Sequence, residues 1–555
     1  MSHVKLNLMI HTAVQLLRRQ SVLFACASLM GVAIFISLFG TWVINPTHVD
    51  WLLVGGDLSQ HYLGWEFYRQ SDWTFPLGVM QNVAYPHGLS IVFMDSIPLF
   101  AIPFKVIAGI LPIHFQYFGI WGLLSFALQS GIAALILRRW SANPIVVLAG
   151  AALLTISPVM FERMFNHTAL AGHWIILLAI FVFIYSRHLN VTRNILVWSL
   201  ILSTAAMIHP YLLFMVSAIF ASLLIINYRS IRQLALSAAV PVVVVVAVIW
   251  LLGGFTIKSV VADGLGRYSY DLITPINALG WSRLMQEVNI PIVSGESSGY
   301  FGAGVLVLAA IGVATGLTSF VKKRIINRRI IIACIPFLLL LIAALSPQVH
   351  FGGQVLIEYP LPRIAEKIWA VFRASARLAW PLYYMTTVVA IYVIVRRWRN
   401  KEVLLSTILV GCLLIQGIDV LVSRRAMERA ERFNQIYLAE FASPLRSDYW
   451  LKLAKNKTHI VYMGSLQDWN FTILSQYAVD NHLTINTGYF ARAPLDKIQS
   501  TINKAETDLI SGHSDTETIY ITKEYERVRK LRSANKSIDI HAIDSYYVLK
   551  NIRLN

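Results

Sequence analysis

The sequence predicts a mainly α polytopic membrane protein that ends in a small α/β domain. Hydrophobic residues make up 56% of the 555 residues, and charged residues only 14%. The apolar residues come in long blocks, as a helix needs if it crosses the roughly 30 Å hydrocarbon core of a bilayer, where no water can satisfy an open backbone. Only residues 423–555 are mixed and polar. We therefore divide the chain into an N-terminal stretch (1–20), a membrane part (21–422) and a C-terminal domain (423–555).

Roughly eleven segments of the membrane part are long and apolar enough to be transmembrane helices. The first is too long for the core of a signal peptide, and no small-residue cleavage motif follows it, so we expect it to be retained. The amphipathic stretch before it, residues 1–20, is expected on the cytoplasmic side. The predicted spans are 21–44, 116–137, 144–161, 170–186, 194–208, 211–227, 233–252, 300–320, 330–345, 378–395 and 403–422.

Basic residues indicate which way these spans run. They fall in alternate short loops, as the positive-inside rule requires of the cytoplasmic side. Segment 96–111 is also apolar, but as a further span it would move every later basic loop to the outside. It also contains two prolines and Lys105, so we expect it to lie at the outer interface. The first outer loop is then 45–115, and the C-terminal domain is outside. The basic loops are Arg138 with Arg139, Arg187 with Arg193, Arg229 with Arg232, 322–329 and 396–401.

Charge and cysteine content exclude several other classes of function. Lysine plus arginine (47) exceed aspartate plus glutamate (29), but the cytoplasmic loops and contact with anionic lipid headgroups account for this excess without nucleic acid. Cys26, Cys334 and Cys412 lie within apolar segments and have no CxxC or Cys/His spacing. They indicate neither a disulfide framework nor a metal site.

The C-terminal segment alternates between strand-like and helix-like patterns. Strand-like runs occupy 459–464, 518–523 and 545–551, and amphipathic, helix-like runs occupy 469–479 and 495–509. The segment contains no glycine-rich phosphate loop and no internal repeat. It predicts a small α/β domain without a nucleotide-binding signature.

The predicted outer loops hold most of the unusual polar residues. In order along the chain, these motifs are GGD…QH…GW.F.R….FPLG (55–78), DSIPL (95–99), F.R…H..L..HW (161–174), HPY (209–211) and FRASARLAWP (372–381). The inner loops, in contrast, are short and merely basic.

This layout resembles the GT-C superfamily of integral-membrane glycosyltransferases. The shared features are an early acidic residue in the first outer loop, interfacial helices with a proline–leucine pair, many spans and a terminal periplasmic domain. The order of the motifs between about residues 21 and 395 looks like an uncharacterised bacterial GT-C-like family. The resemblance implies a multi-pass protein of the bacterial cytoplasmic (inner) membrane with an extracytoplasmic C-terminal domain.

The resemblance also implies a reaction. Such an enzyme moves a sugar from a polyprenyl-phosphate donor to a cell-surface glycan or lipid-linked acceptor on the outer side of the membrane. A carboxylate near the membrane surface can take the proton of the acceptor hydroxyl while the anomeric carbon gains oxocarbenium character, and Asp57 is the expected catalytic residue. The alternative is that Asp57 caps the helix that follows it. No cofactor is required, although one or two outer carboxylates do not exclude a divalent metal ion.

Three further residues of the first outer loop are candidates for substrate binding. His61 is four residues after Asp57 and shares its helical face, so it can orient a sugar hydroxyl or Asp57 itself, or simply lie on a wet interfacial helix. The position of Glu66 relative to Asp57 is less well defined. Asp95 is either a second carboxylate of the site or the cap of the interfacial helix, and the cap is favoured.

Ionisable residues at the outer ends of later spans are also substrate-binding candidates. Arg163, His167 and His173 cluster at one such end, and His209 precedes a proline at another. Charged groups at membrane depth are costly, which favours a functional role, although an arginine can also snorkel and a histidine can be satisfied at a kinked helix end.

Arg373 and Arg377 are four residues apart and are expected on one face of a helix just before a span. Their forked donors suit a lipid-linked phosphate. Any anionic lipid would attract them as well, but arginines are unexpected on the outer side.

Two other functions stay open. A lipid-linked glycan transporter or flippase would also be polytopic and carry buried charges, and a non-catalytic envelope polysaccharide assembly protein would need no base. Transporters often show paired repeats, and this sequence has no such symmetry. The concentration of polar motifs in the outer loops favours an enzyme.

Overall fold

The computed structural model describes most of the chain. Two predicted features, the amphipathic stretch up to residue 18 and the basic run 322–329, lie outside it. The described residues are 19–227, 230–257, 268–288, 290, 299–320, 332, 334–370, 372–438, 440–464 and 471–551.

The described part contains 8 helices that are long and apolar enough to cross a membrane, so the chain is a multi-pass membrane protein. Seven of them expose large apolar side chains, as lipid contact requires; Leu200 and Val243, for example, are 69% and 66% exposed. The helices are α2 (Gln20–Phe39), α5 (Phe118–Arg138), α8 (Trp174–Tyr185, preceded by η5, Thr168–Ala171), α9 (Val191–Ile208), α10 (Pro210–Asn227), α11 (Ile231–Leu251), α16 (Trp380–Arg397, preceded by η8, Ser375–Ala379) and α17 (Glu402–Leu421).

Three other predicted spans contain shorter apolar helices, so the predicted count of eleven is not confirmed. They are α6 (Pro144–Thr155), the segment Ala303–Leu317 of α12 (Ala303–Phe320) and α14 (Ile335–Leu345). The predicted span 144–161 is broken because Pro158 disfavours a helical conformation at the residue before it and starts a separate helix, α7 (Pro158–Arg163). At 1.5 Å per residue, α6 alone is only about 18 Å long.

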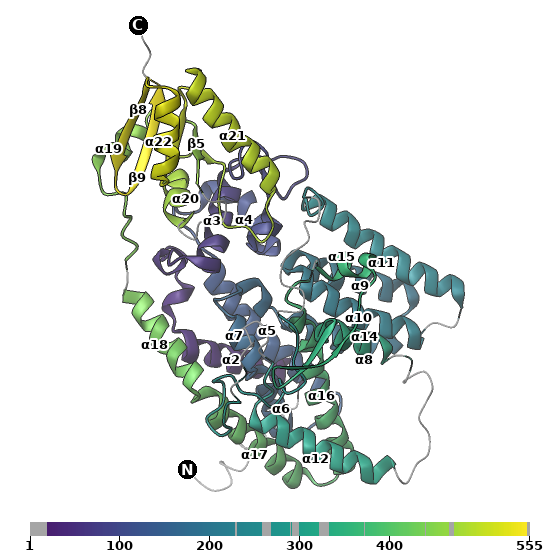
Figure 1. Ribbon diagram of the computed structural model, residues 1–555. Coiled ribbons are helices and arrows are strands. Elements are labelled where there is room, and N and C mark those ends of the chain that lie inside the picture. The colour runs from purple at the N-terminus through teal and green to yellow at the C-terminus, as the bar shows by residue number, and fades with distance from the viewer. Residues whose placement is uncertain are drawn as a thin grey trace.

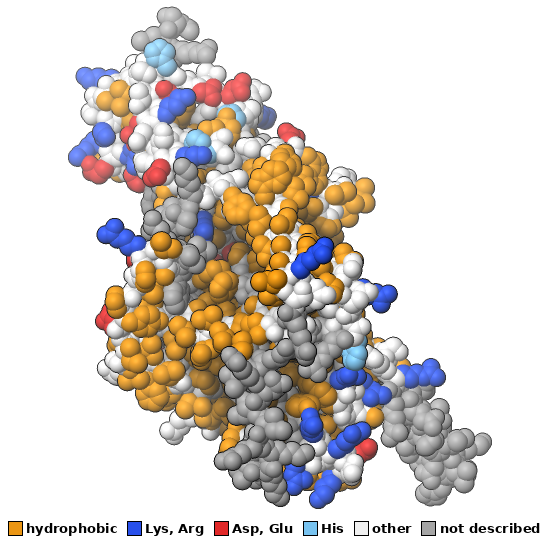
Figure 2. All heavy atoms as spheres, turned by 90° about the vertical axis from the view of Figure 1, so that its right-hand side faces the viewer, with side chains coloured by type: hydrophobic (Ala, Val, Ile, Leu, Met, Phe, Trp, Pro, Cys, Tyr) orange, Lys and Arg blue, Asp and Glu red, His pale blue; other side chains and the backbone are white. Residues whose placement is uncertain are grey.

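Figure 1 shows the apolar helices as one body, with the C-terminal domain set on one end of it beside α3 (Gly56–Gln70) and α4 (Pro98–Val106). In Figure 2, hydrophobic side chains cover much of the visible face of the helical body, while most of the visible acidic side chains lie on the C-terminal domain. Helices α2 and α5 pack closely because Gly31 brings the backbones together. A Cβ placed there would lie 2.2 Å from the Phe126 carbonyl oxygen.

Residues 45–115, which are predicted to be the first outer loop and keep that name below, fold into short elements and contain no additional span. Predicted segment 96–111 forms α4, which has 9 residues, followed by the 3-10 turn η4 (Ala108–Ile110).

Lys105 turns back onto α3, where its Nζ lies 4.2 Å from the centre of the Tyr68 ring and 4.6 Å from that of Trp73. It also donates to Ser71 Oγ at 3.0 Å. Burial lowers the pKa of Lys105 to about 8. The remaining elements are η2 (Asp50–Leu52), β1 (Val79–Met80), β2 (Leu89–Ser90) and η3 (Ile91–Met94).

The C-terminal domain is α/β, as predicted. Its five strands lie in the order β6-β5-β7-β9-β8, in which β5 is parallel to β6 and β7, and β9 is antiparallel to β7 and β8. The predicted strands and helices correspond to β5, β7, β9, α20 and α21. The elements are α19 (Asp448–Ala454), β5 (His459–Tyr462), α20 (Phe471–Asp480), β6 (Thr484–Ile485), α21 (Leu495–Ser511), β7 (Thr518–Thr522), α22 (Tyr525–Ala534), β8 (Ile538–Ile543) and β9 (Tyr546–Asn551).

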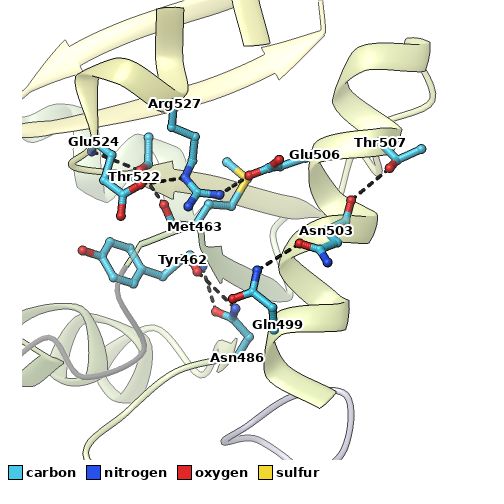
Figure 3. A network of polar contacts seen from close by, with 10 residues as sticks. All are labelled: Tyr462, Met463, Asn486, Gln499, Asn503, Glu506, Thr507, Thr522, Glu524 and Arg527. Carbon is cyan, nitrogen blue, oxygen red and sulfur yellow. Dashed lines mark hydrogen bonds and ion pairs between the residues drawn. The ribbon is translucent and has the colours of Figure 1, made fainter. Parts of the chain in front are cut away.

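Side-chain hydrogen bonds hold the sheet and its helices together (Figure 3). After β6 ends, Asn486 Oδ1 accepts from the Tyr462 N–H at 2.8 Å and Asn486 Nδ2 donates to the Tyr462 carbonyl at 3.1 Å. Arg527 on α22 binds Glu524 at 2.9 Å and also pairs with Glu506 on α21. These contacts fix the end of the sheet from which the next segment, residues 487–494, leaves.

Backbone hydrogen bonds join the C-terminal domain to the first outer loop. The Ile485 N–H donates to the Asn82 carbonyl at 2.9 Å, and the Tyr85 N–H donates to the Ile485 carbonyl at 3.0 Å. The Tyr85 ring stacks on His459 with ring centres 4.1 Å apart. The domain is therefore fixed on the side of the helical body that carries Asp57. Helix α18 (Arg424–Leu438) connects it to α17.

Candidate active site

Asp57 is positioned by the glycine pair that precedes it. Gly55 and Gly56 have φ angles of 92° and 63°, in the left-handed region that favours glycine, and they turn the chain into α3. Gly55 is the N-cap residue and its N–H donates to Ser59 Oγ at 2.8 Å. Asp57 therefore does not occupy the N-cap position. As an acidic residue in the first turn it still suits the positive end of the helix dipole.

Two carboxylate–histidine pairs form the centre of the site. His167 Nε2 lies 3.5 Å from Asp57 Oδ2, and His209 Nε2 lies 3.5 Å from Asp95 Oδ1. The Asp57 and Asp95 side chains remain 24% and 18% exposed, so both can be reached from outside the protein. His167 precedes η5, and His209 lies between α9 and α10. The bundle thus supplies both histidines, and the first outer loop supplies both carboxylates.

Asp95 is placed by a strained backbone and does not cap α4. Its φ angle is 52°, and the N-cap of α4 is Ile97, which offers no side-chain hydrogen bond. The cap interpretation favoured from the sequence is therefore wrong. Burial, together with the negative charge of Asp57, raises the pKa of Asp95 to about 7, so the two carboxylates are electrostatic neighbours.

The hydrogen bonds of His209 define its tautomer. Its Nδ1 accepts from the Tyr211 N–H at 3.2 Å, so in the neutral ring Nε2 carries the proton. This N–H faces Asp95. The extended backbone of His209 (φ −165°) and Pro210 at the start of α10 separate the two helices at this point.

Both predicted arginines are close enough to Asp95 for their charges to affect it. The positive charges of Arg377 and Arg373 lower the pKa of Asp95 and so oppose the effect of burial. The Arg377 guanidinium carbon lies 5.0 Å from the centre of the Tyr211 ring, and the Tyr211 hydroxyl accepts from the Ala374 N–H at 2.9 Å. The expectation that the arginines share a helical face is wrong, because η8 begins at Ser375, after Arg373. Tyr211 contacts the segment between them through the Ala374 N–H.

The C-terminal domain contributes two residues that the sequence interpretation missed. The Tyr489 hydroxyl donates a hydrogen bond to the Asp57 carboxylate. Arg492 lies close enough to Arg373 and Tyr211 for their charges to shift its pKa, which burial lowers. The only sequence signal was an aromatic and an arginine in the loop after a strand. That signal is indistinguishable from ordinary surface composition.

His61 and Glu66 are buried on α3. His61 stacks on Phe118 with ring centres 6.2 Å apart, and burial lowers its pKa to about 3, so the ring is neutral. Glu66 pairs with Arg69 at 3.3 Å, and Arg69 in turn donates to the Pro112 carbonyl at 2.8 Å. Burial raises the pKa of Glu66 to about 7. Arg69 thus ties α3 to the C-terminal end of the first outer loop.

Arg163 and His173 lie in the core of the bundle, around Trp380. The Arg163 guanidinium carbon is 5.7 Å from the centre of the Trp380 ring, and the His173 ring centre is 4.7 Å from it. His173 Nδ1 and the Tyr384 hydroxyl are 2.6 Å apart. His167, from the same predicted cluster, instead lies with its Nε2 3.5 Å from Asp57 Oδ2.

Within the described ranges, no group of three or more His, Cys, Asp or Glu residues is arranged to hold a metal ion. The two carboxylates of the site are each paired with a histidine instead.

Comparison with known proteins gives a family and two similar structures. The sequence matches DUF6311, a domain of unknown function, over residues 28–421, and the DUF6311 C-terminal domain over residues 449–551. No curated protein sequence matches significantly. The two structures have low similarity to this chain, and this similarity assigns no activity to it.

The first structure is the archaeal oligosaccharyltransferase AglB from Archaeoglobus fulgidus in complex with an inhibitory peptide and a dolichol-phosphate. It has 13% identity and a TM-score of 0.38, and the match covers 96% of this chain and 74% of that one. The second is the Archaeoglobus fulgidus oligosaccharyltransferase in complex with Zn and sulfate. It has 12% identity and a TM-score of 0.36, and the match covers 95% of this chain and 74% of that one.

Proposed function

The chain belongs to the DUF6311 family, and we propose that it is a GT-C type glycosyltransferase that moves a sugar from a polyprenyl-phosphate donor to a cell-surface glycan or lipid-linked acceptor. One observation carries the proposal. Two accessible carboxylates, Asp57 and Asp95, lie at the end of an apolar helical body, and Arg373 and Arg377 are close enough to Asp95 for their charges to lower its pKa. This arrangement offers a base for a hydroxyl group and cations for a phosphate, next to a surface that suits a lipid chain.

In the proposed reaction, the oxygen of an acceptor hydroxyl attacks C1 of the donor sugar. The bond between C1 and the phosphate oxygen breaks, its electron pair stays on the phosphate, and Asp57 takes the hydroxyl proton. Arg373 and Arg377 stabilise the negative charge of the departing polyprenyl phosphate. Arg492 adds a third guanidinium on the same side.

The histidines and Asp95 support this chemistry. His167 holds one oxygen of Asp57, and the Nε2–H of His209 faces Asp95. Asp95 lies close enough to bind a sugar hydroxyl next to Asp57. His61, Glu66, Arg163 and His173 stay proposed substrate-binding residues on the basis of the sequence.

Transfer is best distinguished from transport in liposomes. The purified protein should move radiolabel from a polyprenyl-phosphate sugar in the vesicle membrane to envelope glycan added as acceptor, because the reaction breaks the bond between sugar and phosphate. The readout is label in the water-soluble glycan fraction, with protein-free vesicles as control. Movement of intact lipid-linked sugar between leaflets, without loss of the sugar, would instead assign the chain to the flippases.

The proposed reaction requires the site to lie outside the cytoplasmic membrane. Reporter fusions at Lys322 and Arg396 should therefore report the cytoplasm, and a fusion after Asn555 should report the periplasm, because the basic loops alternate along the chain. The measurement compares alkaline phosphatase with green fluorescent protein activity for each fusion. A cytoplasmic C-terminus would place Asp57, which lies beside the C-terminal domain, on the inner side and contradict the proposal.

A further inference from the structure

Residues 487–494 of the C-terminal domain lie against the first outer loop. The Ala491 N–H donates to the Phe93 carbonyl at 2.8 Å, and the same carbonyl accepts from Gln60 Nε2 of α3 at 3.2 Å. Just before the segment, Ile485 forms a parallel bridge with Val83. The segment is thus tied to both the helix that begins at Asp57 and the turn that carries Asp95.

Tyr489 projects from this segment to Asp57. Its hydroxyl donates to the Asp57 carboxylate, and its ring stacks on Phe471 of α20 with ring centres 5.6 Å apart and planes inclined by 28°. Burial, with the negative charge of Asp57, raises the pKa of Tyr489 to about 12. The phenol is therefore protonated at neutral pH and acts as a permanent donor.

Asp57 is held from two sides. His167 of the helical bundle lies close to Oδ2, and Tyr489 of the C-terminal domain donates a hydrogen bond to the same carboxylate. A carboxylate has roughly four lone-pair sites, so two donors can fix its orientation and still leave room for an acceptor hydroxyl. Fixed orientation matters because a general base must lie within hydrogen-bond reach of the proton it takes.

We infer that Tyr489 is a positioning residue for Asp57, so that sugar transfer requires the C-terminal domain to be docked on the first outer loop. The inference rests on the proposed function of Asp57. It assigns the C-terminal domain a direct part in the site, because Tyr489 contacts the proposed base.

The kinetic test uses Tyr489→Phe, which removes only the hydroxyl and keeps the ring on Phe471. The kcat for transfer should fall about ten- to a hundredfold, the scale of one hydrogen bond to a charged group, with the KM for the polyprenyl-phosphate sugar unchanged. The matched control is Tyr477→Phe in the same domain, which loses a hydrogen bond of 2.6 Å to the Trp450 carbonyl. The control should keep the wild-type kcat. A wild-type kcat in Tyr489→Phe, or a loss confined to donor KM, would contradict the inference.

A second measurement needs no substrate. Labelling of Asp57 by a water-soluble carbodiimide, read by peptide mass spectrometry, should be several-fold faster in Tyr489→Phe than in wild type, because one donor no longer engages the carboxylate. Asp480, which accepts from Gln476 at 2.7 Å, serves as the internal reference. Equal labelling of Asp57 in both proteins would overturn the inference even if transfer is observed. Absence of transfer by the wild type, with faster labelling in the variant, would instead contradict the proposed function alone.

Discussion

Asp57→Asn should insert and fold like the wild type and lose about two or more orders of magnitude in transfer rate, the usual scale of general-base catalysis. The amide keeps the size of the side chain, and its oxygen can still accept from His167 and Tyr489, but it cannot take a proton. The measurement is the initial rate at saturating donor. Because Gly55 is the N-cap residue, loss of a cap cannot account for the effect.

A matched variant controls for charge loss in the same loop. Asp50→Asn, in the first turn of η2, should keep a near-wild-type rate. If Asp57→Asn also transfers sugar at a near-normal rate while its thermal stability is unchanged, Asp57 is not the base and the centre of the proposed mechanism is lost.

Removal of either arginine should weaken use of the lipid-linked donor. Charge-assisted hydrogen bonds contribute about 1.5–3 kcal/mol, so the apparent donor affinity should fall by roughly ten- to a hundredfold in Arg373→Ala and Arg377→Ala. The measurement is the dependence of transfer rate on polyprenyl-phosphate sugar in the membrane. Arg373 is exposed, so its loss leaves packing intact, whereas Arg377 is buried against Tyr211.

Two further variants separate donor binding from general attraction to lipid. Arg377→Lys keeps the charge and loses the planar fork, so it should be partly defective if the phosphate is bound through two parallel bonds. Arg432→Ala, at an exposed position on α18, should behave like the wild type. Unchanged donor affinity in both alanine variants of the pair would assign Arg373 and Arg377 to contacts with anionic lipid.

The sequence predicts the helices well because the bilayer imposes a constraint that depends on composition alone. Apolar helices occur in all the predicted spans. Segment 96–111 is apolar but is not one of these spans. Its Lys105 packs between Tyr68 and Trp73, which explains why this apolar segment carries a lysine. Boundaries are less predictable, as the break before Pro158 shows. Strand β6 has only 2 residues, too few to leave a pattern.

The sequence could predict which residues belong to the site, but not which of them contact one another. Outer acidic and basic residues are conspicuous in an apolar sequence, which is why Asp57, Asp95, His167 and His209 were candidates. Which histidine contacts which carboxylate depends on how segments far apart in the sequence pack together, so no local sequence pattern indicates it. The role of Asp95 was misjudged because a helix after an aspartate usually implies a cap, whereas here Ile97 occupies that position. Tyr489 belongs to another domain, so only the docked structure reveals it.

Linkage analysis of cell-surface glycan tests the central claim most directly. A bacterial strain that lacks the protein is complemented either with the wild type or with Asp57→Asn at equal membrane abundance, and its envelope polysaccharide is compared by composition and linkage. The proposed mechanism predicts that one glycosidic linkage is missing in the deletion strain, returns with the wild type and stays missing with Asp57→Asn, while unused polyprenyl-phosphate sugar accumulates. An unchanged glycan in the deletion strain, or full restoration by Asp57→Asn, would contradict it.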